Sequence, residues 1–216
     1  THTIRLLNGF TADDRVLTTL ENGIIFGSLR AAANQYPELI DLHYNRLADN
    51  QADATVALNT AFTQDGAFVY IPDGVTAEKP FLIPGRIAAD ENSAIYLRNL
   101  IVCGPKGEAK IILESVATGE NIFLTNSLTE VYAGHECRLE MVALQQENDK
   151  NTHISNVFVQ QKEASRFQST IVTVDGGTVR NNTSVYLEGP HAENHTYGLF
   201  VCGEGQHTDN STNLEH

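Results

Sequence analysis

The sequence predicts a mainly β protein with a few short helices near its N-terminus, and three observations carry this prediction. From about residue 67 onward, runs rich in Val, Ile, Thr, Tyr and Phe follow one another to the C-terminus. Glycines fall near most of the gaps between these runs, where the chain must turn. No segment of clear helical period separates the runs, so we expect long, closely connected strands.

The first part of the chain mixes strands with helices, and we divide the sequence into an N-terminal segment, 1–62, and a β core, 63–216. Residues 3–7 alternate like a strand, and residues 23–26 form a second, apolar one.

Three helix starts follow from local chemistry. Ser28 is a good N-cap for a helix that begins at Leu29. Pro37 suits the first position of a second helix, because its missing N–H group is unpaired there in any case. Asp53 can cap a third helix over residues 54–62.

The β core has an unusual spacing of strands. The expected strands cover residues 68–71, 81–83, 94–102, 109–116, 122–132 and 138–144 and continue beyond. Their centres recur about thirteen to fifteen residues apart, more than the ~8 to 12 typical of hairpin-built sandwiches. Parallel strands without helical crossovers form when a chain coils so that its turns stack. From spacing alone, a β-helix and an antiparallel sandwich or jelly roll both remain open.

The stretch from residue 179 to the C-terminus combines strand-like alternation with polar residues. Val179 and Val185 can point to one side of an extended segment, and Arg180 and Asn182 to the other. Arg180-Asn181-Asn182 could bind an anion through its guanidinium and amide donors. The favoured interpretation is a corner of the coil, because Asn side chains satisfy exposed backbone groups at turns.

His207 and Asp209 are the sharpest chemical candidates. Residues two apart on a strand share a face, so this pair could ligate a metal or relay a proton. Cys202 offers a soft thiolate ligand nearby. The competing interpretation is that His207 and Asp209 hydrogen-bond to neighbouring turns. Cys103 and Cys202 end apolar runs, and we expect both to be buried.

Composition and missing motifs exclude several function classes. Lys and Arg number 14 against 27 Asp and Glu, a net charge of -13 that repels nucleic acid. No apolar run reaches the ~18 residues of a membrane helix, and no signal peptide is evident. Three scattered cysteines favour a reducing cytoplasm. The common nucleotide-binding, hydrolase and zinc-protease motifs are absent, so we expect a non-enzyme.

The sequence begins at Thr1 and its single Met is Met141, so we expect it to be part of a longer chain. The terminal Leu214-Glu215-His216 can be read either as native sequence or as the start of a purification tag.

A set of motifs occurs in order along most of the chain. They are Ala57-Leu58-Asn59-Thr60-Ala61-Phe62, Leu124-Thr125-Asn126-Ser127, Gln146-Glu147-Asn148, Thr152-His153-Ile154-Ser155-Asn156, Arg180-Asn181-Asn182 and Gln206-His207-Thr208-Asp209-Asn210. The set resembles the SufB/SufD family of the SUF iron-sulfur cluster assembly system. The Asp-Asn that follows Gln-His-Thr resembles the SufD branch more than the SufB branch.

The resemblance implies a flattened, right-handed parallel β-helix with about two strands per turn. It also implies a non-catalytic scaffold subunit that pairs with a SufB-like paralogue and couples to a SufC-like ATPase, with a homodimer as the alternative. No cofactor would be bound stably, and an iron-sulfur cluster or iron would be a transient cargo of the complex. The family's N-terminal helical subdomain and its SufC-docking region are largely missing from this sequence.

Two other functions remain open at this stage. One is a secreted β-helix enzyme acting on carbohydrate, of the pectate-lyase type, with calcium in an acidic groove. The other is a purely structural β-solenoid.

Overall fold

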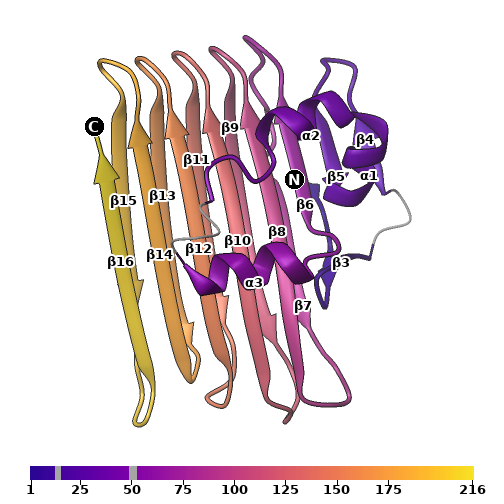
Figure 1. Cartoon of the computed structure of the whole chain (residues 1–216), viewed down its shortest axis with the longest axis vertical. Helices are drawn as coiled ribbons and strands as arrows, with labels where there is room; N and C mark the ends of the chain where they lie inside the picture. Colours follow the sequence, from indigo (N-terminus) through magenta and orange to yellow (C-terminus); the bar gives the residue numbers. More distant parts are fainter. Residues whose placement is uncertain (13–15, 49–52) are drawn as a thin grey trace.

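The computed structural model describes residues 1–12, 16–48 and 53–216. Two sheets stack face to face, and successive strands of the core alternate between them (Figure 1). Each pair of strands is therefore one turn of a flattened solenoid, and β7/β8, β9/β10, β11/β12, β13/β14 and β15/β16 are five such pairs in the described residues. The predicted parallel solenoid is confirmed. An antiparallel sandwich is excluded, because core neighbours within each sheet run parallel.

The strand bounds follow the predicted runs closely. One sheet contains β7 (Phe81–Ile87), β9 (Glu108–Ala117), β11 (Arg138–Gln146), β13 (Arg166–Asp175) and β15 (Glu193–Phe200). The other, called sheet B below, contains β6 (Ala67–Ile71), β8 (Ser93–Cys103), β10 (Phe123–Ala133), β12 (Thr152–Gln161), β14 (Thr178–Leu187) and β16 (His207–Glu215).

The register explains the strand spacing seen in the sequence. One turn takes 30 residues between the paired residues Ser93 and Phe123, and 26 between Thr152 and Thr178. Each turn contributes one strand to each sheet, so runs recur at about half that interval.

Short strands at the N-terminus begin the two sheets. They are β1 (His2–Thr3), β2 (Leu6–Leu7), β3 (Phe10–Thr11), β4 (Leu17–Thr19) and β5 (Ile25–Ser28). The strand expected over residues 3–7 is thus divided into β1 and β2, which both pair with β7. Asp65 connects β3, β5 and the helix that begins at Leu29. Its carboxylate accepts hydrogen bonds from Thr11, from the Ser28 hydroxyl and from the Arg30 amide.

All three predicted helix starts are confirmed. The Ser28 hydroxyl caps α1 (Leu29–Gln35), Pro37 opens α2 (Pro37–His43), and Asp53 caps α3 (Ala54–Phe62) through the amide of Thr55. α3 lies across the outer face of sheet B, over β8 and β10 (Figure 1).

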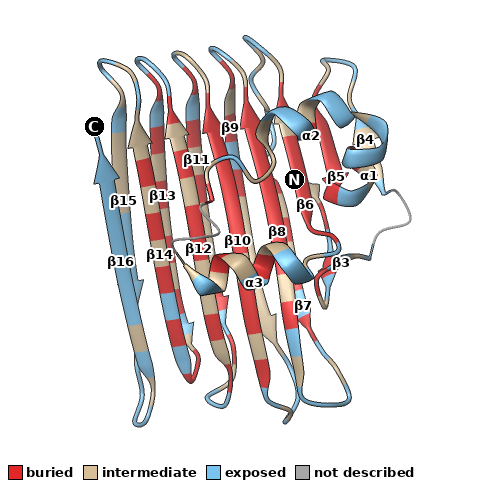
Figure 2. Ribbon diagram, viewed as in Figure 1, coloured by how far each residue is buried: buried red, intermediate tan, exposed pale blue. Residues whose placement is uncertain are grey.

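Burial is uneven along the solenoid. The strands near the helices are buried on both faces, whereas β15 and β16 are largely exposed (Figure 2). Strand β8 shows the double burial: Leu97 and Ile101 point into the interior between the sheets, while Leu100 and Val102 pack beneath the helical segment. Hydrophobic burial therefore anchors the N-terminal segment to the solenoid.

The corner predicted at Arg180-Asn181-Asn182 is wrong. These residues lie in the middle of β14. One corner of the solenoid is instead made by non-glycine residues with positive φ: Lys106, Glu136, Ala164 and His191. Each of the first three donates its amide to the next corner, with N–O distances of 2.7, 2.9 and 2.9 Å. Stacked corners stabilise a backbone conformation that the side chains alone do not favour.

Candidate functional site

Polar side chains gather at one side of the solenoid interior, where strands of sheet B begin and strands of the opposite sheet end. The buried or half-buried members are Ser115, Thr125, Ser127, Gln145, Glu147, His153, Thr173 and Asn181. The opposite side of the interior is apolar, with Cys103, Val131, Ala133 and Cys137. The polar side therefore brings acid, base and hydroxyl groups close together inside the solenoid.

Glu147 and His153 form the centre of this cluster. Glu147 follows β11, His153 lies near the start of β12, and the two side chains are 1% and 4% exposed. Glu147 Oε1 lies 2.6 Å from His153 Nδ1. The hydroxyls of Ser115 and Thr125 donate to the two carboxylate oxygens at 2.7 and 3.1 Å. A buried carboxylate with this many donors is fully hydrogen-bonded.

These contacts set the charge state of the carboxyl group. Burial raises the pKa of Glu147, but the charge of His153 and the hydrogen bonds from His153, Ser115 and Thr125 together bring the pKa below its ordinary value. Because an ionised carboxylate can only accept, the His153 Nδ1 atom must carry a proton. In the neutral ring, the lone pair then lies on Nε2, which is 3.4 Å from Ser127 Oγ.

A small cavity of about 50 Å³ borders this group. Its lining includes Ser127, His153 and Ser155, together with Asn99 and Gln145. A cavity of this size and polarity has room for a few water molecules or one small ligand.

A second set of buried amides continues the polar interior toward the C-terminus. The Gln145 amide donates to Asn181 Oδ1 at 2.7 Å, and the Thr173 hydroxyl donates to Gln145 Oε1 at 2.6 Å. Asn181 in turn donates to Asn210 Oδ1 at 2.9 Å. Asn181 and Asn210 thus join β14 to β16 inside the solenoid, an interior role that the sequence prediction did not assign them.

The predicted metal candidates do not form a three-ligand cluster in the described residues. His207 and Asp209 share the outer face of β16, as their spacing predicted, and Asp209 Oδ2 lies 3.8 Å from Arg180 Nε. Cys202 is exposed, and its thiol donates to the hydroxyl of Thr208, which is paired with the buried Val179. Within the described residues, no group of three or more His, Cys, Asp or Glu side chains could hold a metal ion.

The expected burial of Cys202 is wrong, whereas Cys103 is buried as expected. Cys202 belongs to the last turn of the described chain, and no further turn packs over it. Two other residues of the predicted motif also make structural contacts. Gln206 donates to Asp175 at 2.7 Å, and Asn182 donates to Asn156 at 2.9 Å on the outer face.

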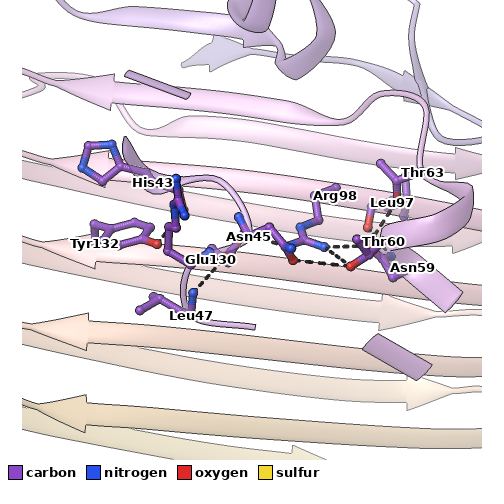
Figure 3. A network of polar contacts seen from close by, with 11 residues as sticks. His43, Asn45, Leu47, Asn59, Thr60, Thr63, Leu97, Arg98, Glu130 and Tyr132 are labelled. Carbon is purple, nitrogen blue, oxygen red and sulfur yellow. Dashed lines mark hydrogen bonds and ion pairs between the residues drawn. The ribbon is translucent and has the colours of Figure 1, made fainter. Parts of the chain in front are cut away.

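A charged network on the outer face of sheet B holds the N-terminal segment (Figure 3). Arg98 Nη2 lies 2.8 Å from Glu130 Oε2, and both side chains are 0% exposed. Glu130 also accepts from the amides of Asn45, Arg46 and Leu47 at 2.8 to 3.0 Å. The network binds the segment before α3 to strands β8 and β10.

Helix α3 is held in the same way. The buried side chain of Asn59 donates to the carbonyl oxygens of Leu97 and Asn126, both at 2.9 Å. Arg98 donates to the Thr60 hydroxyl at 3.0 Å. These residues position the helix, and nothing about their contacts indicates a reacting group.

The sequence did not predict the Glu147–His153 cluster or the Arg98–Glu130 network. The available signal for Arg98 was a single charge inside an apolar run. Glu147, His153 and Ser127 stood only within the motifs that carried the family resemblance, and their contact depends on the stacking of turns.

Two family models together match almost the whole chain. Residues 86–216 match the SUF system FeS cluster assembly, SufBD core domain, and residues 1–83 match the SufBD protein N-terminal region. The chain belongs to the SufB/SufD family. Membership in the SufB/SufD family favours cluster assembly over the carbohydrate-active and purely structural alternatives.

Individual SufB/SufD proteins are similar over most of this chain. The iron-sulfur cluster assembly protein SufB of Bacillus subtilis (strain 168) is 25% identical over 204 residues, which are 90% of this chain and 42% of that protein. SufD of the same organism is 23% identical over 210 residues, 89% of this chain and 44% of that protein. The chloroplastic SufBD family protein ABCI8 of Arabidopsis thaliana is 28% identical over 212 residues, which are 92% of this chain and 37% of that protein.

The chain therefore spans less than half the length of these relatives, and it is about equally similar to SufB and SufD. None of the helices in the described part of the chain is long and apolar enough to cross a membrane.

Proposed function

We propose that this chain is a SufD-like, non-catalytic scaffold subunit of a SUF assembly complex. It would pair with a SufB-like paralogue and couple to a SufC-like ATPase in the cytoplasm. The observation that carries the proposal is the match of both family regions to one continuous solenoid that includes the N-terminal segment.

A second copy of this chain is the alternative to the SufB-like paralogue as its partner.

A cluster or iron ion would be cargo of the whole complex in this scheme. His207, Asp209 and Cys202 remain proposed as contacts to such cargo, since all three are exposed and carry side chains that can ligate iron. The chain itself would hold no cofactor stably.

Co-purification of the full-length protein with its SufB-like and SufC-like partners tests the proposal. We expect one complex that contains all three chains. Recovery of this protein alone or only as a homodimer, when the other two chains co-purify with each other, would contradict it.

Replacing Cys202 and His207 by Ala in that complex tests the cargo contacts separately. We expect less iron and sulfide after anaerobic reconstitution, with complex formation unchanged. Unaltered cluster content would limit both residues to structural roles.

A further inference from the structure

Ser127, His153 and Glu147 form a line of three hydrogen-bonding side chains inside the solenoid. Glu147 Oε1 is 2.6 Å from His153 Nδ1, and His153 Nε2 is 3.4 Å from Ser127 Oγ. A hydroxyl, an imidazole and a carboxylate in this order are the parts of an activated-serine site. The residues come from β10, β12 and the turn before β12, so only the stacking of turns brings them together.

Glu147 and His153 are held in the orientation that this chemistry needs. Ser115 and Thr125 fix the Glu147 carboxylate, which in turn orients the His153 ring through Nδ1. Whenever the His153 ring is neutral, its Nε2 lone pair can accept the Ser127 proton. The 3.4 Å contact is long for a hydrogen bond, as is common before a ligand is bound.

The neighbouring Ser155 provides an internal comparison. Ser155 is paired in register with Ser127, and both line the same cavity of about 50 Å³. Among the described residues, no hydrogen bond joins Ser155 to His153 or Glu147. The two serines therefore share access and surroundings but differ in contact with the imidazole.

We propose that Ser127 Oγ is a nucleophile for small activated acyl or sulfonyl groups that reach this cavity. Oγ attacks the carbonyl carbon or sulfur, the bond to the leaving group breaks, and the Ser127 proton passes to His153 Nε2. From there the proton passes to the departing group or to water. The product is a serine ester, and no oxidant or reductant is required. This property does not depend on the scaffold function proposed above.

The cavity limits what can react. Ser127 is half-buried, whereas His153 and Glu147 are almost completely enclosed. A volume of about 50 Å³ admits a group of a few heavy atoms and excludes bulky aromatic esters. The expected substrates are thus acetyl-sized groups on a good leaving group.

Methanesulfonyl fluoride is a suitable probe, because it is small and releases fluoride when a serine attacks its sulfur. We expect intact-mass analysis of the folded protein to show one adduct, and peptide mapping to place that adduct on Ser127. Ser127→Ala should abolish the adduct, and the matched control Ser155→Ala should retain it. His153→Gln should lower the labelling rate about 100-fold or more, the effect of removing a general base.

Glu147→Gln provides a second variant if His153→Gln fails to fold, as judged by circular dichroism. It should slow labelling, because a neutral amide does not stabilise the imidazolium that forms and its NH2 group can donate to Nδ1, which favours the wrong tautomer. Labelling of Ser155 at a similar rate, unchanged rates in a folded His153 or Glu147 variant, or no adduct on the native protein would each overturn the proposal. Ser127→Ala should leave binding of the SUF partners intact, which separates this test from that of the scaffold function.

Discussion

Replacing Glu130 by Ala should destabilise the protein by about 3–5 kcal/mol, the usual cost of breaking a buried ion pair from one side. Both Glu130 and Arg98 are 0% exposed, so the substitution leaves an uncompensated buried guanidinium. It also removes the acceptor for the amides of Asn45, Arg46 and Leu47. Domains of this kind have a total stability of about 5–15 kcal/mol, so the expected loss is a large fraction of it.

Urea unfolding followed by circular dichroism and tyrosine fluorescence measures the effect, since the chain has 7 Tyr and no Trp. For a chain of this length the melting temperature should fall by roughly 6–20 °C. The matched control is Glu114→Ala. Glu114 pairs with Arg86 at 3.2 Å, but the two side chains are 25% and 50% exposed. Solvent screening limits the cost of that substitution to about 1 kcal/mol or less.

Equal effects of less than about 1 kcal/mol for both variants would refute the reasoning that burial distinguishes the two pairs. Limited proteolysis shows where the structure opens. We expect cleavage in the segment before β6 to rise first in Glu130→Ala, because that segment loses its anchor while the solenoid keeps its strand pairs.

Three further outcomes follow from the structure. Gly66→Ala should strongly lower the melting temperature of the protein, since an added Cβ would lie 1.6 Å from the carbonyl oxygen of Arg98. The matched control Gly198→Ala should leave the melting temperature nearly unchanged, because its added Cβ would have no contact closer than 3.7 Å. The free energy of unfolding should fall as pH drops below about 4.5, because folding lowers the pKa of Glu147. Glu147→Gln should flatten this pH dependence. If the variant and the wild type gave the same curve of stability against pH, the prediction would be contradicted. The exposed last turn should make the isolated chain self-associate and Leu199→Lys should reduce this; a clean monomer in light scattering would count against it.

Much of the local structure was predictable because it depends on neighbouring residues. Ser28, Pro37 and Asp53 start their helices through contacts within one or two turns of the chain. The alternation of Val179 and Val185 likewise identifies the buried face of β14, since side chains of a strand alternate between its two faces.

The candidate site was not predictable in this way. Arg180-Asn181-Asn182 resembled a corner because Asn favours turns, yet Asn181 instead joins amides from other turns inside the solenoid. Glycines such as Gly119 and Gly176 do lie in turns, as predicted, but at one corner stacked backbone hydrogen bonds hold Lys106 and Ala164 in the left-handed conformation instead. Composition could not foresee either result, because both are made by contacts with the next turn.

Local sequence was therefore enough for the helix starts, the strand runs and the family, all of which rest on patterns within short stretches. Tertiary structure alone decided which polar residues meet. Ser127 and His153 are 26 positions apart and become neighbours because strand pairing offsets β10 and β12 by 28 residues. Burial then strengthens the hydrogen bonds of this group, since Glu147 accepts them from protein groups where water is largely excluded.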